Sequence, residues 1–205
     1  MLLYIIVILV SIALITLGHG FFMTPMFSEP LELLFVALYL VIGTIAVIAI
    51  DGLFAVVIRR LTPEKWYLPG KKLFIVSKKE TKFYKFLKIK AWKDKVPELG
   101  MFTGLSKSQL GDTNDIKYLR QFLIEINYGT IIHLVNALTG FLVILIPMPM
   151  FTSFEIWLPI FIVNFVLSMM PVFILRYTSY TLYRIYQSKL KKQEKADSQA
   201  NEKND

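Results

Sequence analysis

Long runs of residues without charged side chains are the feature that most limits how this chain can fold. Leu2–Leu17 carries no charge, and Leu31–Ile58 carries two acidic residues, one near each end. Two further apolar runs cover about Gly129–Met150 and about Ile156–Leu175. Because roughly 20 apolar helical residues cross the ~30 Å hydrocarbon layer of a bilayer, the sequence predicts an all-α membrane protein with about four transmembrane helices.

The first run leaves two interpretations open. Leu2–Leu17 is short for a span, which is typical of a signal peptide, but it has no basic residues before it and no small-residue cleavage site after it. We therefore favour a retained helix. Pro147, Pro149 and Pro159 predict a tight connection between the last two spans, which would form a helical hairpin.

The basic residues predict the orientation. Of the 23 Lys and Arg residues, 16 lie between Arg59 and Arg120 and the other 7 between Arg176 and Lys203, whereas the connections 18–30 and 148–155 contain none. Because cytoplasmic loops retain positive charge, both basic segments and both termini are expected on the cytoplasmic side of a cell membrane. The predicted organisation is an N-terminal membrane hairpin (1–58), a basic, partly helical interfacial segment (59–127), a C-terminal membrane hairpin (128–187) and a disordered tail (188–205).

The interfacial segment contains three recognisable parts. Leu73–Val76 is typical of a short strand or an interfacial piece. Residues 82–96 are rich in lysine and aromatic groups, which favours a position against lipid headgroups, although a solvated loop would show the same bias. The apolar groups expected to enter the membrane are Phe83, Tyr84, Phe86, Leu87 and Trp92.

The third part is a predicted helix that continues into the third span. Asp115 is positioned to cap its N-terminus. Apolar residues then follow at helical spacing, namely Ile116, Leu119, Leu123 and Ile126.

Polar residues inside the spans are the functional candidates, because an ionisable group in hydrocarbon is costly unless it is paired or hydrated. His133 lies one turn inside the third span, with Asn136 and Gly140 on the same helical face. Its imidazole could act as a general base, or it could simply hydrogen-bond to a neighbouring helix. The other histidine, His19, is expected on the surface of the outer connection.

Three more ionisable residues are expected near the same membrane surface. Asp51 precedes the arginines that end the second span, Glu125 precedes His133 by eight residues, and Arg176 closes the fourth span. We expect these residues and Asn136 to converge on one plane with His133. The alternative for each is a plain anchor or a contact between helices.

Three motifs resemble a known family. The strongest is in the basic segment and comprises Trp92, Lys93, Asp94, Pro97, Glu98, Gly100, Gly104, Ser106 and Lys107. The second comprises Phe122, Leu123, Glu125 and His133, and the third comprises Pro171, Arg176 and Tyr177. Together, over about Lys79–Tyr177, the chain is similar to the glycosyl-4,4'-diaponeurosporenoate acyltransferases, membrane enzymes that acylate the sugar of a glycosylated carotenoid. It departs from that pattern at Tyr128, Thr130, Leu134, Thr178 and Ser179.

The resemblance implies transfer of a fatty acyl group from acyl-CoA to a hydroxyl of a lipid-linked sugar, on a glycosylated carotenoid or another glycolipid. His133 would be the base, Glu125 or Asp94 would orient it, and Arg176 would stabilise the oxyanion or hold a phosphate. The cationic side chains expected to bind the donor phosphates are Lys90, Lys93, Lys95 and Lys107. The other substrate-binding candidates are Trp92, Glu98, Asn136 and Asp51.

The composition sets limits on other chemistry. The chain has no cysteine and two histidines, so thiolate chemistry is absent and a multi-ligand zinc site is not expected. No phosphate loop or dinucleotide-binding glycine pattern is present. We expect no metal, no cofactor beyond the thioester donor and no nucleic-acid partner. A non-catalytic scaffold or complex subunit that binds anionic lipid through its basic face remains the alternative, so the sequence leaves open whether the protein is an enzyme.

Overall fold

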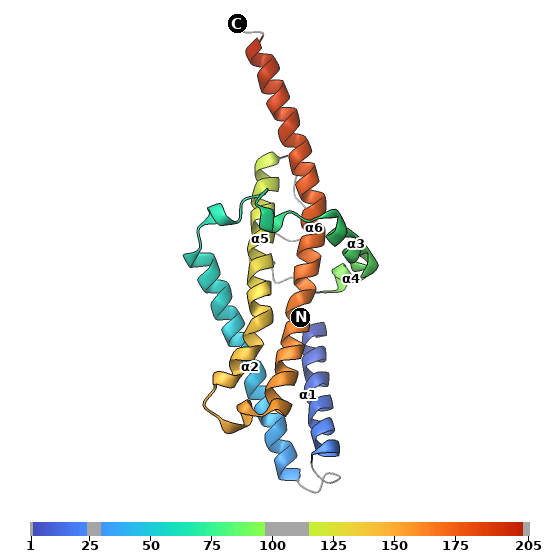
Figure 1. Ribbon diagram of the computed structural model, residues 1–205, viewed down its shortest axis with the longest axis vertical. Coiled ribbons are helices and arrows are strands. Elements are labelled where there is room, and N and C mark those ends of the chain that lie inside the picture. The colour runs from blue at the N-terminus through green and yellow to red at the C-terminus, as the bar shows by residue number, and fades with distance from the viewer. Residues whose placement is uncertain (1, 24–29, 97–114, 203–205) are drawn as a thin grey trace. The chain divides into compact units, whose positions relative to one another are not determined.

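The computed structural model describes residues 2–23, 30–96 and 115–202, and every regular element in these ranges is a helix (Figure 1). The long helices are α1 (Leu2–Phe22), α2 (Pro30–Leu61), α5 (Ile116–Thr139) and α6 (Phe154–Glu202). The short ones are α3 (Lys78–Phe86), α4 (Ile89–Trp92) and the 3₁₀ turns η2 (Glu64–Trp66), η3 (Lys72–Phe74), η4 (Lys93–Lys95), η7 (Gly140–Leu145) and η8 (Pro149–Thr152).

Within the described ranges, four helical stretches are long and apolar enough to cross a membrane, which confirms the predicted all-α membrane fold. They are Tyr4–Phe22, Pro30–Leu61, Ile116–Leu145 and Phe154–Gln199. Large apolar side chains on α1 and α2 face outward, for example Leu14 at 64% exposure and Ile45 at 62%. Such exposure is favourable when the surrounding solvent is lipid, and the helical backbone satisfies its own hydrogen bonds there.

The described chain divides into two units. Unit 1 comprises Met1–Leu61 and Ile131–Pro171, and unit 2 comprises Thr62–Thr130 and Val172–Asp205. Helices α5 and α6 each contribute to both units. The N-terminal hairpin therefore packs with the first part of α6, and the basic segment packs with the later part of α6. The predicted domains, which follow one another along the sequence, do not group the chain in this way.

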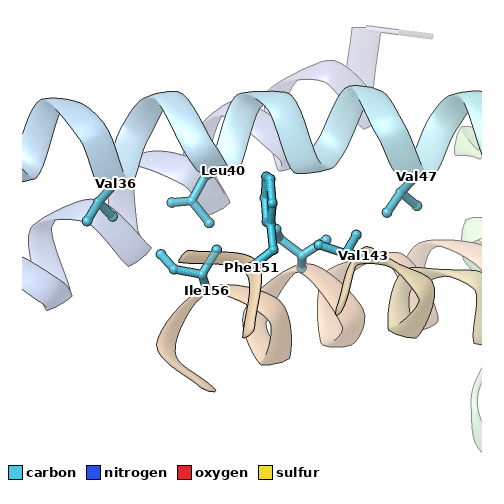
Figure 2. Close-up of a cluster of buried hydrophobic side chains, with 7 residues drawn as sticks. Val36, Leu40, Val47, Val143, Phe151 and Ile156 are labelled. Atoms are coloured by element: carbon cyan, nitrogen blue, oxygen red, sulfur yellow. The ribbon is translucent and has the colours of Figure 1, made fainter. Parts of the chain in front are cut away.

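The core of unit 1 is formed where α2 meets the connection between α5 and α6. Phe151 is fully buried and points toward α2, with its ring between Leu40 and Val47 (Figure 2). Gly43 makes this approach possible, because a Cβ atom there would lie 3.0 Å from the Phe151 ring and 2.6 Å from Ile160 Cδ1. The buried members of this core are Val36, Leu40, Val47, Val143, Phe151, Ile156 and Ile160.

The core of unit 2 confirms the helix predicted from Asp115. The Asp115 carboxylate accepts a hydrogen bond from the backbone N–H of Lys117 at 2.8 Å, as expected for an N-terminal cap. The apolar stripe of α5 is buried against Leu182 of α6. Its members are Leu119, Phe122, Leu123 and Ile126. Tyr67 stacks on Tyr128 with 3.7 Å between ring centroids, which fixes the start of the basic segment on α5.

Several local features differ from the sequence predictions. Residues Lys72–Phe74 form a 3₁₀ turn rather than a strand, because the described residues offer no partner strand and the Leu73 carbonyl accepts a hydrogen bond from Arg176 instead. Pro159 lies inside α6. His19 lies in α1, where its Nε2 atom is 3.2 Å from Glu32 Oε1. Helix α6 also continues to Glu202, since its C-terminal residues are good helix formers that extend an existing helix.

Candidate functional site

Four polar side chains from α2, α5 and α6 gather inside unit 1, and we call them the intramembrane polar cluster: Asp51, Asn136, Thr139 and Asn164. The Thr139 hydroxyl has two acceptors in reach, the Asp51 carboxylate and the backbone carbonyl of Asn136 at 2.8 Å. Asn164 Nδ2 donates to the same Asn136 carbonyl at 2.6 Å. The cluster therefore links three predicted spans through side-chain hydrogen bonds.

Two members of the cluster are buried, Asp51 and Asn164 are half-buried, and one buried atom is left unpaired. Thr139 is 2% exposed and Asn136 is 7% exposed. The side-chain oxygen Oδ1 of Asn136 is buried without a hydrogen-bond partner among the described residues. A buried polar atom left unpaired typically costs about 1–3 kcal/mol, so an unpaired acceptor inside a membrane bundle is a candidate ligand contact.

His133 lies on α5 one turn before Asn136 and is half-buried. Within the described ranges its imidazole has no hydrogen-bond partner, and helical spacing places it on the same face as Asn136 and Gly140. Gly140 meets α6 closely, as the predicted small-residue face requires. The structure thus places His133 and two members of the intramembrane polar cluster, Asn136 and Thr139, on consecutive turns of α5.

Gly140 is expected to be essential for this packing. A Cβ atom at position 140 would lie 3.1 Å from the Phe161 Cα atom and 3.1 Å from Asn164 Cβ, and the backbone atom cannot yield without moving α6. We predict that Gly140→Ala lowers the free energy of unfolding by about 1–3 kcal/mol. Gly52→Ala is the matched control, because, apart from the backbone of its own helix and its chain neighbours, no described atom lies within 4 Å of its added Cβ atom. Equal unfolding midpoints for the two variants in lipid nanodiscs would contradict this packing.

In unit 2, Arg176 is engaged by the basic segment. Its Nη2 atom donates to Glu80 Oε2 at 2.9 Å, its Nε atom donates to Glu80 Oε1, and its Nη1 atom donates to the Leu73 carbonyl at 3.0 Å. The Tyr84 hydroxyl donates to the same carboxylate. Ser77 begins α3 by accepting a hydrogen bond from the Glu80 backbone N–H at 3.1 Å, which holds Glu80 in the first turn.

This arrangement changes the titration of Glu80. Burial raises the pKa of Glu80, but hydrogen bonds from Arg176 and Tyr84 and the positive charge of Arg176 outweigh burial, so the pKa lies below its ordinary value of 4.5. Burial, followed by the neighbouring Glu80 carboxylate, raises the pKa of Tyr84, and its hydroxyl remains a donor.

The lowered pKa predicts a loss of stability in acid. A carboxylate with a folded-state pKa below its unfolded-state value contributes stability above pH 4.5, and the contribution is lost as the pH falls through the folded-state pKa. We predict that the thermal unfolding midpoint of Glu80→Gln falls less steeply as the pH decreases, so that the acid limb of its stability curve is flatter. Glu64→Gln, at an exposed carboxylate 3.5 Å from Arg120, is the control and should leave the limb unchanged. The thermal unfolding midpoint measured against pH checks this, and parallel curves for wild type and Glu80→Gln would contradict it.

The remaining candidates of the basic segment lie in α4 and η4. Lys90 is exposed, and the Trp92 indole N–H donates to the Leu87 carbonyl at 3.0 Å. Asp94 is 79% exposed and lies 3.9 Å from Lys93 Nζ. Lys95 ends η4.

The aromatic residues of α3 differ in burial. Tyr84 is 3% exposed and packs against Phe173, whereas Phe83 and Phe86 are 47% and 79% exposed. Of the residues predicted to contact lipid, Tyr84 is therefore committed to the protein interior, Phe83 and Phe86 are exposed, and Leu87 and Trp92 are half-buried.

The predicted site residues are distributed over both units. Asp51, His133 and Asn136 belong to unit 1, whereas Asp94, Glu125 and Arg176 belong to unit 2. Glu125 is half-buried on α5. Glu98 and Lys107 lie outside the described residues. The predicted convergence on one plane thus stays a prediction.

Sequence reasoning did not identify Glu80, Thr139 or Asn164. A signal existed for Asn164, which is a single amide within the apolar stretch of α6 and falls under the same rule that selected His133. Glu80 was marked by the Ser77-x-x-Glu80 capping pattern. Neither local signal identifies the residue on another helix that completes the contact.

The fold and the buried cluster define a multi-spanning α-helical membrane protein with polar groups enclosed among its spans. Residues 63–188 match the family model of glycosyl-4,4'-diaponeurosporenoate acyltransferase, and because the match covers more than half of the chain, the protein belongs to this family. At family level it is a membrane acyltransferase. No curated protein and no solved structure matches the chain. The matched range includes His133, Asn136, Thr139 and Asn164, whereas Asp51 lies before it.

Proposed function

We propose that the protein transfers a fatty acyl group from acyl-CoA to a hydroxyl of a lipid-linked sugar, on a glycosylated carotenoid or another glycolipid, at the cytoplasmic face of the cell membrane. The observation that carries this proposal is the family match over residues 63–188, which includes His133 and three members of the intramembrane polar cluster. Both termini and the basic segment are cytoplasmic in this proposal, where acyl-CoA is found.

The chemical step needs one base. The acceptor hydroxyl oxygen attacks the thioester carbonyl carbon, forming the new C–O bond while its proton passes to the His133 imidazole. Collapse of the tetrahedral intermediate breaks the C–S bond, and the imidazolium returns the proton to the departing CoA thiolate. The products are the acylated lipid and free CoA. The half-buried position of His133, without a hydrogen-bond partner among the described residues, supports this role because its ring is not committed elsewhere.

The basic segment is suited to the donor. CoA carries several phosphates, and Lys90 is exposed while Lys93 is partly exposed, so both are available to bind them. The same stretch contains the remaining candidates for binding substrate, which are Trp92, Lys95, Glu98 and Lys107. Anionic headgroups would be attracted by the same charges, which would keep this segment at the membrane surface.

Arg176 is better supported as an anchor than as an oxyanion contact. Three of its nitrogen atoms already donate to Glu80 and to the Leu73 carbonyl. Its proposed role is to fix the basic segment on α6.

Lipid analysis separates this function from the scaffold alternative. Lipids would be extracted from cells with the protein, without it, and with it restored, and examined by mass spectrometry. We expect an acylated glycolipid that disappears in the cells without the protein and returns when the protein is restored. Its unacylated precursor should accumulate in the cells without the protein. An unchanged lipid profile would support a non-catalytic lipid-binding scaffold.

A further inference from the structure

Two asparagines on α5 are buried, and their side chains differ in pairing. Asn127 is 3% exposed, and its Nδ2 atom donates to the Tyr67 carbonyl at 2.7 Å. Asn136 is 7% exposed, and its Oδ1 atom has no partner among the described residues. The first asparagine has an evident structural purpose. The second places an unpaired acceptor where membrane proteins rarely leave one.

The hydrogen bonds of the intramembrane polar cluster leave one acceptor without a donor. The Thr139 hydroxyl and the Asn164 amide are directed to the Asp51 carboxylate and the Asn136 backbone carbonyl. Among the described residues, no donor reaches Asn136 Oδ1. A ligand that fits the cluster must therefore bring its own O–H or N–H groups.

The donors present also argue against a metal cation as this ligand. Asn164 Nδ2 lies 2.6 Å from the Asn136 carbonyl and 3.5 Å from Thr139 Oγ1, so its N–H groups face the oxygens that a cation would need. An uncharged hydroxyl group pairs with the free acceptor without competing with these N–H groups. The polar headgroup of a sugar-bearing lipid has hydroxyls of this kind.

We propose that the intramembrane polar cluster is a recognition site for a lipid-linked hydroxyl, in which Asn136 Oδ1 accepts the hydrogen bond from the ligand. Asn164 is a positioning residue, since it holds the α5 backbone at Asn136. Asp51 contributes from α2, outside the family-matched range, by holding Thr139. The assignment of this ligand as the acyl acceptor rests on the proposed function, because His133 stands one turn away on α5.

The test measures binding without catalysis. Saturation-transfer NMR would record the Kd of hexyl β-glucoside for the protein in nanodiscs, with hexyl methyl ether as the ligand that lacks any O–H donor and empty nanodiscs as the blank. We expect Asn136→Leu to raise the glucoside Kd about 3- to 10-fold, the usual value of one neutral hydrogen bond, and to leave binding of the ether unchanged. Because the substitution removes an unpaired buried acceptor, the thermal midpoint should stay equal or rise.

Two variants complete the design. Asn127→Leu removes a paired asparagine from the same helix, and it should lower the thermal midpoint while leaving the glucoside Kd unchanged. Asn164→Leu keeps the Asn136 side chain and removes the donor to its backbone carbonyl, so it should also weaken glucoside binding relative to the ether. This second variant tests the site even if Asn136→Leu fails to fold.

The outcomes separate this inference from the proposed function. Glucoside binding that is absent in wild type, or that is unchanged in both Asn136→Leu and Asn164→Leu, overturns the recognition site. Stabilisation by sodium that is lost in Asp51→Asn, without glucoside binding, also overturns it in favour of a cation site. Binding that depends on Asn136 in a protein that shows no acyl transfer supports the site and contradicts only the proposed function.

Discussion

Replacing His133 with alanine is expected to reduce acyl transfer at least about 100-fold while leaving the protein in the membrane. A positioned general base typically contributes a factor of 10² to 10⁴ to the rate. Among the described residues, no group is hydrogen-bonded to the His133 imidazole, so the substitution breaks no hydrogen bond there. The measurement is the rate at which labelled acyl groups pass from acyl-CoA into glycolipid in isolated membranes, normalised to the amount of protein.

The chain provides its own matched control, because it has two histidines. His19 lies in α1 and contacts Glu32 at 3.2 Å. His19→Ala should keep acyl transfer within a few-fold of wild type. Full activity in His133→Ala would eliminate the histidine as the base, and equal losses in the two variants would indicate a general effect on folding rather than on chemistry.

Replacing Arg176 with methionine is expected to lower the free energy of unfolding by about 1–3 kcal/mol. The side chains of Arg176 and Glu80 are 17% and 23% exposed, so removing one partner leaves a largely buried charge without its counterion. Breaking a fully buried ion pair typically costs 3–5 kcal/mol, and we expect a smaller loss because this pair is partly solvated. Denaturant titration of the protein in detergent micelles measures this change.

An exposed ion pair provides the control for this prediction. Arg120 and Glu64 are 43% and 52% exposed and lie 3.5 Å apart, so Arg120→Met should cost at most about 1 kcal/mol. Adding Glu80→Gln to Arg176→Met should recover part of the loss, because the uncompensated carboxylate is then gone. A loss of stability no larger than that of Arg120→Met, together with a large loss of acyl transfer, would instead favour the predicted oxyanion role.

Hydropathy and spacing were sufficient to predict the spans and α5. The four apolar runs became helices because lipid leaves the backbone no other way to satisfy its hydrogen bonds. Asp115 caps α5 as its position predicted, and Leu119, Leu123 and Ile126 are buried at helical spacing. These features depend on short-range periodicity and on the solvent, and both can be inferred from a single sequence.

The pairing of distant polar residues could not be predicted in the same way. Glu80 and Arg176 are 96 residues apart, and Thr139 and Asp51 are 88 apart, so no local pattern connects them. The sequence marked Arg176 as a functional residue because it ends an apolar run, but the selection of Glu80 as its partner depends on how α3 packs against α6. Asn164 shows the same limit, because its role depends on the hydrogen bond that it donates to the Asn136 carbonyl on another helix, α5.

The acyl-transfer reaction is tested most directly with purified protein in liposomes that contain carbonyl-labelled acyl-CoA and a glucosylated lipid. We predict that label appears as an ester on the sugar, that one free CoA thiol is released for each ester formed, and that His133→Ala stops both. Label that remains on CoA, or that is released only as free fatty acid, would contradict the assignment of this protein as an acyltransferase acting on a lipid-linked hydroxyl.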